Sequence, residues 1–403
     1  MTDVEITVGA VAHGGHCVAR HDGRVIFVRH ALPGERVVAR LTDAAPGASF
    51  WRADAVSVVE PSPDRVETPW PDAGAGGVGG GELGHVALPA QREWKLAVLR
   101  DSSERFASAE FPGTVEAAPG DDERGGLAYR TRVSVIADAE GRAAMRLARS
   151  HDVRALTAMP LATPDAEAAL LGERFPAGST IAVVDPSGGD IFVTVNGDRW
   201  HGGKRDTRPN AARRVREVVR SGDGEHAMVV DATGFWQVHR EAPSLLATRV
   251  AALAGGGSTV LDLYAGAGLL TVALASGFER VVSVESDADA VRAARRNVAG
   301  TDNVTVAEGD VRHTLRTGFG EHSVGQADVV VLDPPRSGAG RETLEALAAF
   351  SPERVVYVAC DPVALARDTA LLSGHRYALT SAEAWDLFPM THHVEAIAVF
   401  ERA

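Results

Sequence analysis

VLDLYAGAGLLTVALA, residues 260–275, is an apolar run that ends at a glycine-containing turn and continues with helical composition. Three later apolar runs end in the same way: RVVSVES (280–286), ADVVVLDPP (327–335) and RVVYVAC (354–360). Alternation of such runs with helical stretches predicts a parallel sheet with helices on both faces. We therefore expect an α/β, Rossmann-like domain at 231–403, whose ligands bind at the carboxyl ends of the strands.

The rest of the chain divides by composition into four segments. Residues 1–61 alternate apolar and polar positions between turn residues, which predicts a small antiparallel β-barrel. Residues 62–89 are rich in Pro and Gly without periodicity and are expected to form a linker. Residues 90–125 begin with helical spacing and are expected to pack on the carboxyl-terminal domain. Residues 126–230 mix strands with a helical stretch and predict a central α+β domain.

Cysteine content and hydropathy indicate where the protein acts. The 403 residues include two cysteines, Cys17 and Cys360, and no apolar run long enough to cross a bilayer. The amino end lacks the basic segment and apolar core of a signal peptide. These features predict a cytoplasmic protein with no membrane partner.

The formal net charge of −13 argues against a generic nucleic-acid binder, but two stretches are locally basic. The first contains Arg199, Lys204, Arg205, Arg208, Arg213, Arg214, Arg216 and Arg220. The second contains Arg130, Arg132, Arg142, Arg146, Arg149 and Arg154. Such runs are either solvated faces or, if they line one groove, sites for phosphates. The charge balance leaves both interpretations open.

The turn after the first apolar run is suited to close approach by a ligand. Gly266 and Gly268 permit a tight turn, and Glu285 at the end of the next run can accept hydrogen bonds from ribose hydroxyls. The third glycine of a dinucleotide fingerprint is replaced by Thr271. The pattern leaves three alternatives: a nicotinamide site, a site for S-adenosylmethionine (which has no pyrophosphate), or a plain turn.

The segment LDPPRSGAG, residues 332–340, predicts a rigid turn that aims Asp333 into the same cleft. Amino-methylating enzymes have a similar Asp-Pro-Pro turn followed by an aromatic residue. Arg336 stands here instead, which argues against amino-group chemistry. The alternative is a simple proline turn.

Cys360 lies where an apolar run meets a helical stretch. Lone buried cysteines are usually inert, but a helix amino terminus lowers a thiol's pKa and favours thiolate. A thiolate beside a methyl donor suggests methylation at C5 of a pyrimidine, which needs addition of a nucleophile at C6 and a base at C5. Glu395, on an expected late strand, could be this base; the alternative is an edge-strand charge that faces water.

Several motifs together resemble the S-adenosylmethionine-dependent RNA 5-methyluridine methyltransferases. They are VVLDPPRSGAG (330–340), VYVACDPVALARD (356–368), AWDLFPMTHHVEAIAVFER (384–402) and GFWQVHREAP (234–243). GGHCVARHDGRVIFVRHALPGERV (14–37) is similar to the TRAM barrel, an OB-like fold, that precedes their catalytic domain. The resemblance implies a class I methyltransferase domain, S-adenosylmethionine as cofactor, a structured tRNA or rRNA substrate, and a monomer.

The resemblance also implies residue roles. Cys360 matches the nucleophile at C6 and Glu395 matches the base at C5. The positions that match contacts to the methyl donor are Gln237, Tyr264, Glu285, Asp310 and Asp333.

Four departures from the family pattern leave questions open. Several members hold an iron–sulfur cluster with four cysteines, but the first linker and central region here contain none, so we expect no cluster and no metal. Asp361 and Leu269 stand where the family has Asn, and His239 ends its Gln-Val-Asn. Uridine or cytidine therefore remains open as the target. A catalytically silent RNA-binding protein and a nicotinamide-dependent oxidoreductase are the alternative functions.

Overall fold

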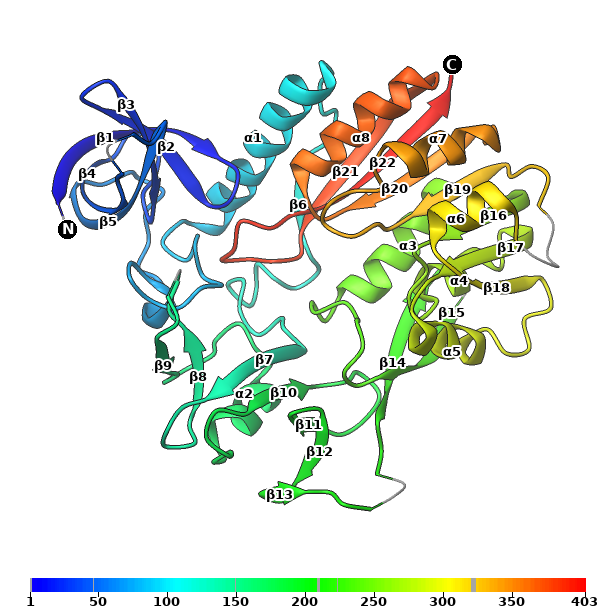
Figure 1. The fold of residues 1–403 in the computed structure, drawn as a ribbon, viewed down its shortest axis with the longest axis horizontal. Helices are drawn as coiled ribbons and strands as arrows, with labels where there is room; N and C mark the ends of the chain where they lie inside the picture. Colours follow the sequence, from blue (N-terminus) through cyan, green and yellow to red (C-terminus); the bar gives the residue numbers. More distant parts are fainter. Residues whose placement is uncertain (1, 46, 149, 209–210, 223, 320–323) are drawn as a thin grey trace.

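The computed structural model describes residues 2–403 apart from 46, 149, 209–210, 223 and 320–323 (Figure 1). The chain forms a closed barrel, a seven-stranded sheet, a two-stranded sheet and an eight-stranded sheet; the last of these takes all its strands but β6 from the carboxyl-terminal part. The barrel lies at one side, and the large carboxyl-terminal sheet with its helices lies at the other.

The amino-terminal barrel has the strand order β1-β2-β3-β5-β4. Its strands are β1 (Asp3–Ala12), β2 (His16–His21), β3 (Arg24–Arg29), β4 (Arg36–Asp43) and β5 (Phe50–Glu60). The barrel was expected to be antiparallel, but β3 and β5 pair in parallel. A closed ring of five strands cannot alternate direction at every seam, because five is an odd number.

The expected linker, residues 62–89, is packed rather than extended. Trp70 and Val78 lie in the core of the seven-stranded sheet, whereas Leu83 and Val86 lie in the core of the barrel. The segment contains a short 3-10 helix, η1 (Pro71–Ala73). It therefore joins the barrel to the middle of the molecule through buried apolar contacts.

Helix α1 (Leu88–Ala107) lies between the barrel and the large sheet (Figure 1). Its Trp94 and Val98 contribute to the barrel core, and its Leu96 and Leu99 to the core of the large sheet. The helix packs along α8 (Pro362–Gly374), and the chain after it forms β6 (Val115–Ala117) at the edge of the large sheet. A helix that is apolar on two sides can bridge two cores.

The structure distributes the expected central domain over two sheets. The seven-stranded sheet has the order β13-β12-β11-β10-β7-β8-β9. Its strands are β7 (Arg132–Ala137), β8 (Ala143–Arg146), β9 (Val153–Ala155), β10 (Thr180–Val184), β11 (Phe192–Val195), β12 (Asp198–His201) and β13 (Lys204–Arg205). Helix α2 (Pro164–Leu171) packs against this sheet.

Strands β14 (Arg214–Ser221) and β15 (Gly224–Asp231) form a separate hairpin. Their inward residues, such as Val219 and Met228, share a core with Leu246 of helix α3 (Ala242–Ala254). The hairpin therefore packs with the carboxyl-terminal domain, although its residues precede the expected boundary at 231.

The large sheet has the strand order β18-β17-β16-β19-β20-β22-β21-β6. Its main strands are β16 (Gly257–Leu263), β17 (Phe278–Glu285), β18 (Val304–Glu308), β19 (Val329–Leu332), β20 (Arg354–Ala359), β21 (Tyr377–Asp386) and β22 (Glu395–Arg402). The first five of these in spatial order are parallel, as expected. Strand β22 then runs antiparallel to both neighbours, which the sequence did not indicate.

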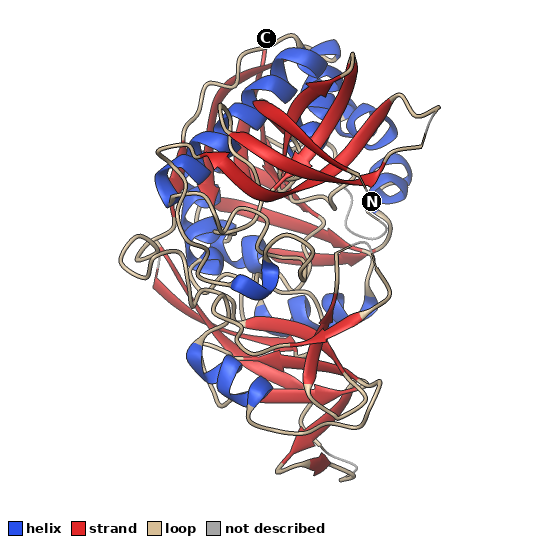
Figure 2. Ribbon diagram, turned by 90° about the vertical axis from the view of Figure 1, so that its left-hand side faces the viewer, coloured by secondary structure: helices blue, strands red, loops and turns tan. Residues whose placement is uncertain are grey.

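Helices cover both faces of this sheet (Figure 2). Helices α1, α6, α7 and α8 pack on one face, and α3, α4 and α5 on the other. The bounds not yet given are α4 (Leu269–Leu274), α5 (Ala288–Asn297), α6 (Val311–Thr317) and α7 (Arg341–Ala349). In the part of the chain that the structure describes, no helix is long and apolar enough to span a membrane.

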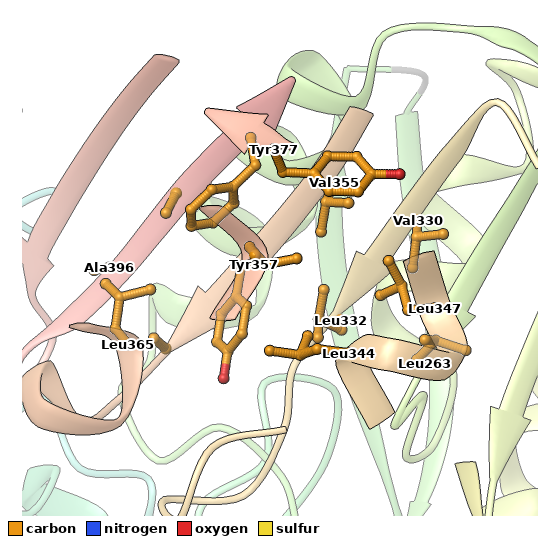
Figure 3. Close-up of a cluster of buried hydrophobic side chains, with 14 of the residues drawn as sticks. Leu263, Val330, Leu332, Leu344, Leu347, Val355, Tyr357, Leu365, Tyr377 and Ala396 are labelled. Atoms are coloured by element: carbon orange, nitrogen blue, oxygen red, sulfur yellow. The ribbon is translucent and has the colours of Figure 1, made fainter. Parts of the chain in front are cut away.

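Alternate residues of the central strands point to opposite cores. Leu263, Leu332 and Tyr357 pack with α7 and α8 on one face (Figure 3), whereas Val260 and Val356 pack on the other. Burial on both faces explains why these strands are almost continuously apolar in the sequence.

Candidate active site

Strand register brings the expected site residues together at the carboxyl-terminal ends of the parallel strands of the large sheet. Leu263 pairs with Leu332, and Leu332 with Tyr357, so the segments that follow β16, β19 and β20 begin side by side. Glu285 pairs with Glu308 at the same ends of β17 and β18. The residues at or just beyond these ends are Tyr264, Glu285, Asp310, Asp333 and Cys360.

Cys360 and Glu395 meet across the ladder between β20 and β22. Ala359 pairs with Ala396 in antiparallel register at the end of the ladder, and Cys360 and Glu395 are the adjoining residues of the two segments. They lie close enough for the charge of Glu395 to raise the pKa of the Cys360 thiol. Glu395 is 4% exposed, so it is not an edge charge that faces water. Cys360 is half-buried.

The environment of Cys360 raises the pKa of its thiol to about 12. Burial is the largest cause, followed by the negative charges of Glu395 and Asp333, and Arg336 acts in the opposite direction. The net shift is therefore opposite to the lowered pKa expected for a thiol at the start of a helix. The Asp361 carboxylate caps the helix by accepting the N–H of Ala364 (2.8 Å), so a negative charge already occupies its amino end.

The two carboxyl groups of the site also hold protons more tightly than usual. Burial raises the pKa of Asp333 to about 7. Burial and the charge of Asp333 raise the pKa of Glu395 well above its ordinary value, and Arg336 opposes this change. Interacting groups with such shifts are typical of acid–base chemistry.

The Glu285 carboxylate is held in place by backbone groups at the end of β17. It accepts N–H bonds from Gly266 (2.9 Å), Ser286 (2.6 Å) and Asp287 (2.8 Å). Gly266 and Gly268 both have positive φ, as the tight turn requires. Oε2 accepts a single one of these bonds, so a lone pair remains for a ligand hydroxyl.

Tyr264 and Asp310 line one surface pocket together with residues 339–343 at the start of α7. Tyr264 is half-buried and has a left-handed backbone (φ 63°), which turns the chain away from β16 toward the pocket. Asp310 is exposed and caps α6 by accepting the N–H of His313 (2.9 Å). The structure thus brings these two expected residues to a shared site.

Gln237 lies in the loop between β15 and α3, beside Trp236, which is buried in the core that includes Leu269. The His239 side chain that follows is buried and structural. Its Nδ1 accepts the N–H of Glu241 (3.0 Å), so Nε2 carries the proton and donates to Asp121 (2.9 Å). His239, which stands where the family has Asn, therefore anchors this loop.

The two basic stretches differ in their availability for phosphates. On β14, Arg214, Arg216 and Arg220 are exposed on the side opposite the buried valines. In the second stretch, Arg132 is 10% exposed and pairs with Glu217 (3.2 Å). Arg149 lies outside the described residues. Arg142, Arg146 and Arg154 of the second stretch are exposed, so both stretches offer arginines to a phosphate backbone.

Sequence analysis missed two residues that the fold brings to the site. Lys95 of α1 is fully buried and pairs with Asp386, just before the loop that leads to Glu395. His13 of the barrel contacts Asp361, next to Cys360. A lysine in an apolar helical face was a possible signal for the first, since the chain has two lysines. Within the described residues, no group of His, Cys, Asp or Glu is arranged to hold a metal ion.

Two family profiles and several relatives match this chain. The sequence profile of the tRNA (uracil-5-)-methyltransferases matches residues 242–403, and that of the TRAM domain matches residues 2–55. An uncharacterized RNA methyltransferase of Streptomyces coelicolor is 40% identical, over 100% of this chain and 93% of its own length. One from Bifidobacterium longum is 39% identical over 100% and 97%.

A solved structure has the same fold. The Pyrococcus abyssi tRNA (uracil-54, C5)-methyltransferase, in complex with S-adenosyl-L-homocysteine, superposes with a TM-score of 0.71 at 21% identity. The match covers 98% of this chain and 100% of that one. Sequence relatives, profiles and fold agree with the expected α/β class and amino-terminal barrel: the chain belongs to the RNA 5-methyluridine methyltransferase family, with a TRAM barrel followed by a methyltransferase domain.

Proposed function

We propose that this protein methylates C5 of a uridine in tRNA or rRNA through a covalent bond between Cys360 and C6. The observation that carries the proposal is the proximity of Cys360 and the buried Glu395 at the end of the β20–β22 ladder. Methylation at C5 needs a nucleophile for C6 and a base for the C5 proton on neighbouring positions. This ladder supplies both groups side by side.

The residues at the sheet edge fit S-adenosylmethionine. The site offers oxygen acceptors from Glu285, Asp310 and Asp333, which suit the hydroxyl and ammonium donors of this cation. The N–H of Gly266 donates to Glu285, whereas a pyrophosphate would need such an amide for itself. Glu285 would hold the ribose hydroxyls, and Gln237, Tyr264, Asp310 and Asp333 would complete the site. When bound, S-adenosylmethionine supplies an electrophilic methyl group and a positive charge.

Cys360 must give up its proton as its sulfur bonds to C6 of the base; the thiol is half-buried, so water can accept that proton. Because burial and the neighbouring carboxylates raise the thiol pKa to about 12, the free protein holds the thiol in its neutral form. Arg336 lowers the pKa of Cys360 and of Glu395, so it favours the charged forms that the reaction requires. Sulfur addition moves the C5–C6 electrons toward C5 and O4, which makes C5 nucleophilic.

Glu395 completes the reaction at C5. Once C5 carries the new methyl group, the Glu395 carboxylate accepts the C5 proton. The electrons of the broken C–H bond restore the C5–C6 double bond, and the sulfur of Cys360 leaves. These covalent steps need no metal, because every bond forms or breaks between the base, the methyl donor, Cys360 and Glu395.

The target base must leave its stack to reach this edge, which costs a few kcal/mol and less in a loop. We propose that the TRAM barrel and the exposed arginines of β14 hold the RNA backbone. We further propose that the enzyme acts as a monomer in the cytoplasm.

Two substitutions test the proposal, because they stop the reaction at different points. Cys360→Ala cannot bond to C6, so both methylation and the covalent complex should vanish. Glu395→Gln still permits addition and methylation, but it blocks removal of the C5 proton, so a methylated RNA–protein adduct should accumulate. Denaturing gels with labelled RNA from a deletion strain would show a slow band for Glu395→Gln and none for Cys360→Ala.

Methylation by the Cys360→Ala variant would contradict the covalent mechanism. Nucleoside mass spectrometry of the same RNA distinguishes 5-methyluridine from 5-methylcytidine and identifies the modified RNA. A wild-type protein that binds RNA without methylating it would be the silent alternative. Binding of NAD rather than S-adenosylmethionine would favour the oxidoreductase.

A further inference from the structure

The tip of the β1–β2 hairpin of the barrel reaches the end of the large sheet at which the active-site residues lie. His13 Nε2 lies 3.1 Å from Asp361 Oδ2, although the two residues are 348 positions apart. Gly14 and Gly15, both at positive φ, turn the chain immediately after His13. The barrel therefore contacts the residue that follows Cys360.

Both carboxylate oxygens of Asp361 are engaged. Oδ1 accepts the N–H of Ala364 and caps α8, while Oδ2 contacts His13. Asp361 is 25% exposed and His13 is 44% exposed, so the pair lies at a partly wet seam. With its side chain held from both sides, Asp361 fixes the turn in which Cys360 sits.

The same hairpin tip also lies against the loop that leads to Glu395. A Cβ on Gly15 would lie 3.2 Å from Cβ of Glu82 and 3.4 Å from Cβ of His392, so the backbones approach closely there. His392 Nδ1 lies 3.8 Å from Glu82 Oε2. His392 is three residues before Glu395, so one hairpin abuts the segments that carry both the nucleophile and the base.

Elsewhere the loop before Glu395 is held by contacts independent of His13. Met390 donates its N–H to Gln91 (2.7 Å) and accepts that of Leu83 (2.9 Å), and Tyr129 donates to the carbonyl of Pro389 (3.1 Å). Loss of the His13 contact should therefore loosen the turn at Cys360 without unfolding the loop.

We propose that His13 is a positioning residue for the nucleophile, so that docking of the TRAM barrel sets the reactivity of Cys360. This inference rests on the proposed function and goes beyond a barrel that only holds RNA. It predicts that His13 affects the chemical step rather than substrate affinity, because His13 touches Asp361 and acts through it.

The test compares His13→Ala, His13→Gln and the control His21→Ala. His21 lies in β2 of the same barrel and contacts its neighbour Asp22 (3.5 Å) rather than Asp361, so its loss should leave kcat unchanged. With RNA from a deletion strain, kcat of His13→Ala should fall about tenfold or more, since small misplacements of reacting groups have such effects. KM for RNA and the affinity for S-adenosylmethionine should stay within about twofold, as expected for lost transition-state positioning.

Rescue by glutamine distinguishes positioning from a general loss of structure. His13→Gln keeps a side-chain N–H donor for Asp361, so kcat should recover toward that of the wild type. A wild-type kcat in His13→Ala would overturn the proposal. So would a loss confined to KM or to RNA affinity, because that result would make His13 an RNA contact.

Thiol alkylation gives a second measurement that needs no RNA. Cys17 is fully buried, so iodoacetamide should react with Cys360 alone. In His13→Ala the loosened turn should expose Cys360 and speed alkylation, whereas His21→Ala should react like the wild type. An unchanged or slower rate would overturn the proposal. If the wild type methylates no uridine, the proposed function fails, and the alkylation rates still decide the role of His13.

Discussion

Arg336 places a positive charge beside three groups of the site, Cys360, His393 and Glu395. It lowers the pKa of the thiol and of the carboxyl group, against burial, which raises both. It is exposed, so solvent weakens its effect. Its position after the Asp-Pro-Pro turn is the one that an aromatic residue occupies in amino-methylating enzymes.

Arg336→Gln should shift the acid limb of the pH profile of kcat/KM to higher pH. Without the guanidinium, Cys360 and Glu395 hold their protons to higher pH, although Cys360 must lose its proton to react and Glu395 must be a carboxylate to accept the C5 proton. The measurement is kcat/KM across the pH range in which the protein stays folded. Arg367→Gln, an exposed arginine on α8 that contacts Phe106, is the matched control. A profile that moves to lower pH, or not at all, would contradict this role.

Glu285→Ala should weaken binding of S-adenosylmethionine by about 1–3 kcal/mol, which is typical of a lost hydrogen bond to a charged group. Calorimetric titration of the cofactor measures the effect. Glu279→Ala, at the other end of β17 and exposed, should bind as the wild type does. Equal affinity in Glu285→Ala would remove this residue from the cofactor site.

At the scale of elements, β14 shows how one strand can serve two purposes. Val215 and Val219 point into the core shared with α3, and the arginines alternate with them toward solvent. The same period of two residues both anchors the strand and presents a row of positive charges.

Replacing Arg213 and Arg214 together with Gln should flatten the salt dependence of RNA affinity. Each lost phosphate contact lowers the slope of log K against log salt by roughly 0.7 for single strands. Cofactor affinity should not change. Filter binding between low and moderate salt measures the slope, and Arg105→Gln on α1 is a control on another surface. An unaltered slope would make this face of β14 ordinary solvated surface.

At the scale of the whole molecule, the buried pair of Lys95 and Asp386 joins α1 to the carboxyl-terminal sheet across 291 residues. Lys95 also donates to the carbonyl of Phe388 (3.1 Å), at the start of the loop that leads to Glu395. Burial lowers the pKa of Lys95, and the charge of Asp386 opposes that shift. Each charge of this buried pair is therefore stabilised by the other, and removal of one partner leaves the other unpaired.

Lys95→Met should lower the free energy of unfolding by about 3–5 kcal/mol, because it leaves the Asp386 carboxylate buried without its partner. Urea unfolding followed by tryptophan fluorescence measures the loss. Lys204→Met replaces the chain's other lysine, which is exposed on β13, and should change stability by less than about 0.5 kcal/mol. Lys95→Met/Asp386→Leu should recover part of the stability. Equal stability of Lys95→Met and the wild type would contradict a structural role for the pair.

Local patterns in the sequence were sufficient for the strand–turn–helix units, the glycine turn before α4, and the residues that end the parallel strands. Each of these features depends on neighbours within one short segment, since burial on both faces makes a strand continuously apolar and a tight turn needs glycine. Cys360 and Glu395 were identifiable because a thiol and a carboxylate are unusual at the ends of such apolar runs.

Tertiary structure alone decided the features that join distant segments. The antiparallel entry of β22 sets Cys360 opposite Glu395, and three residues of β6 extend the sheet from outside the expected domain. The same holds for the contact of His13 with Asp361 and for the raised pKa of Cys360. Sequence alone determined which residues could act, because residue chemistry and local periodicity lie within each segment. The fold decided which of them meet and how their charges shift, because burial and electrostatic contact arise only when remote segments pack together.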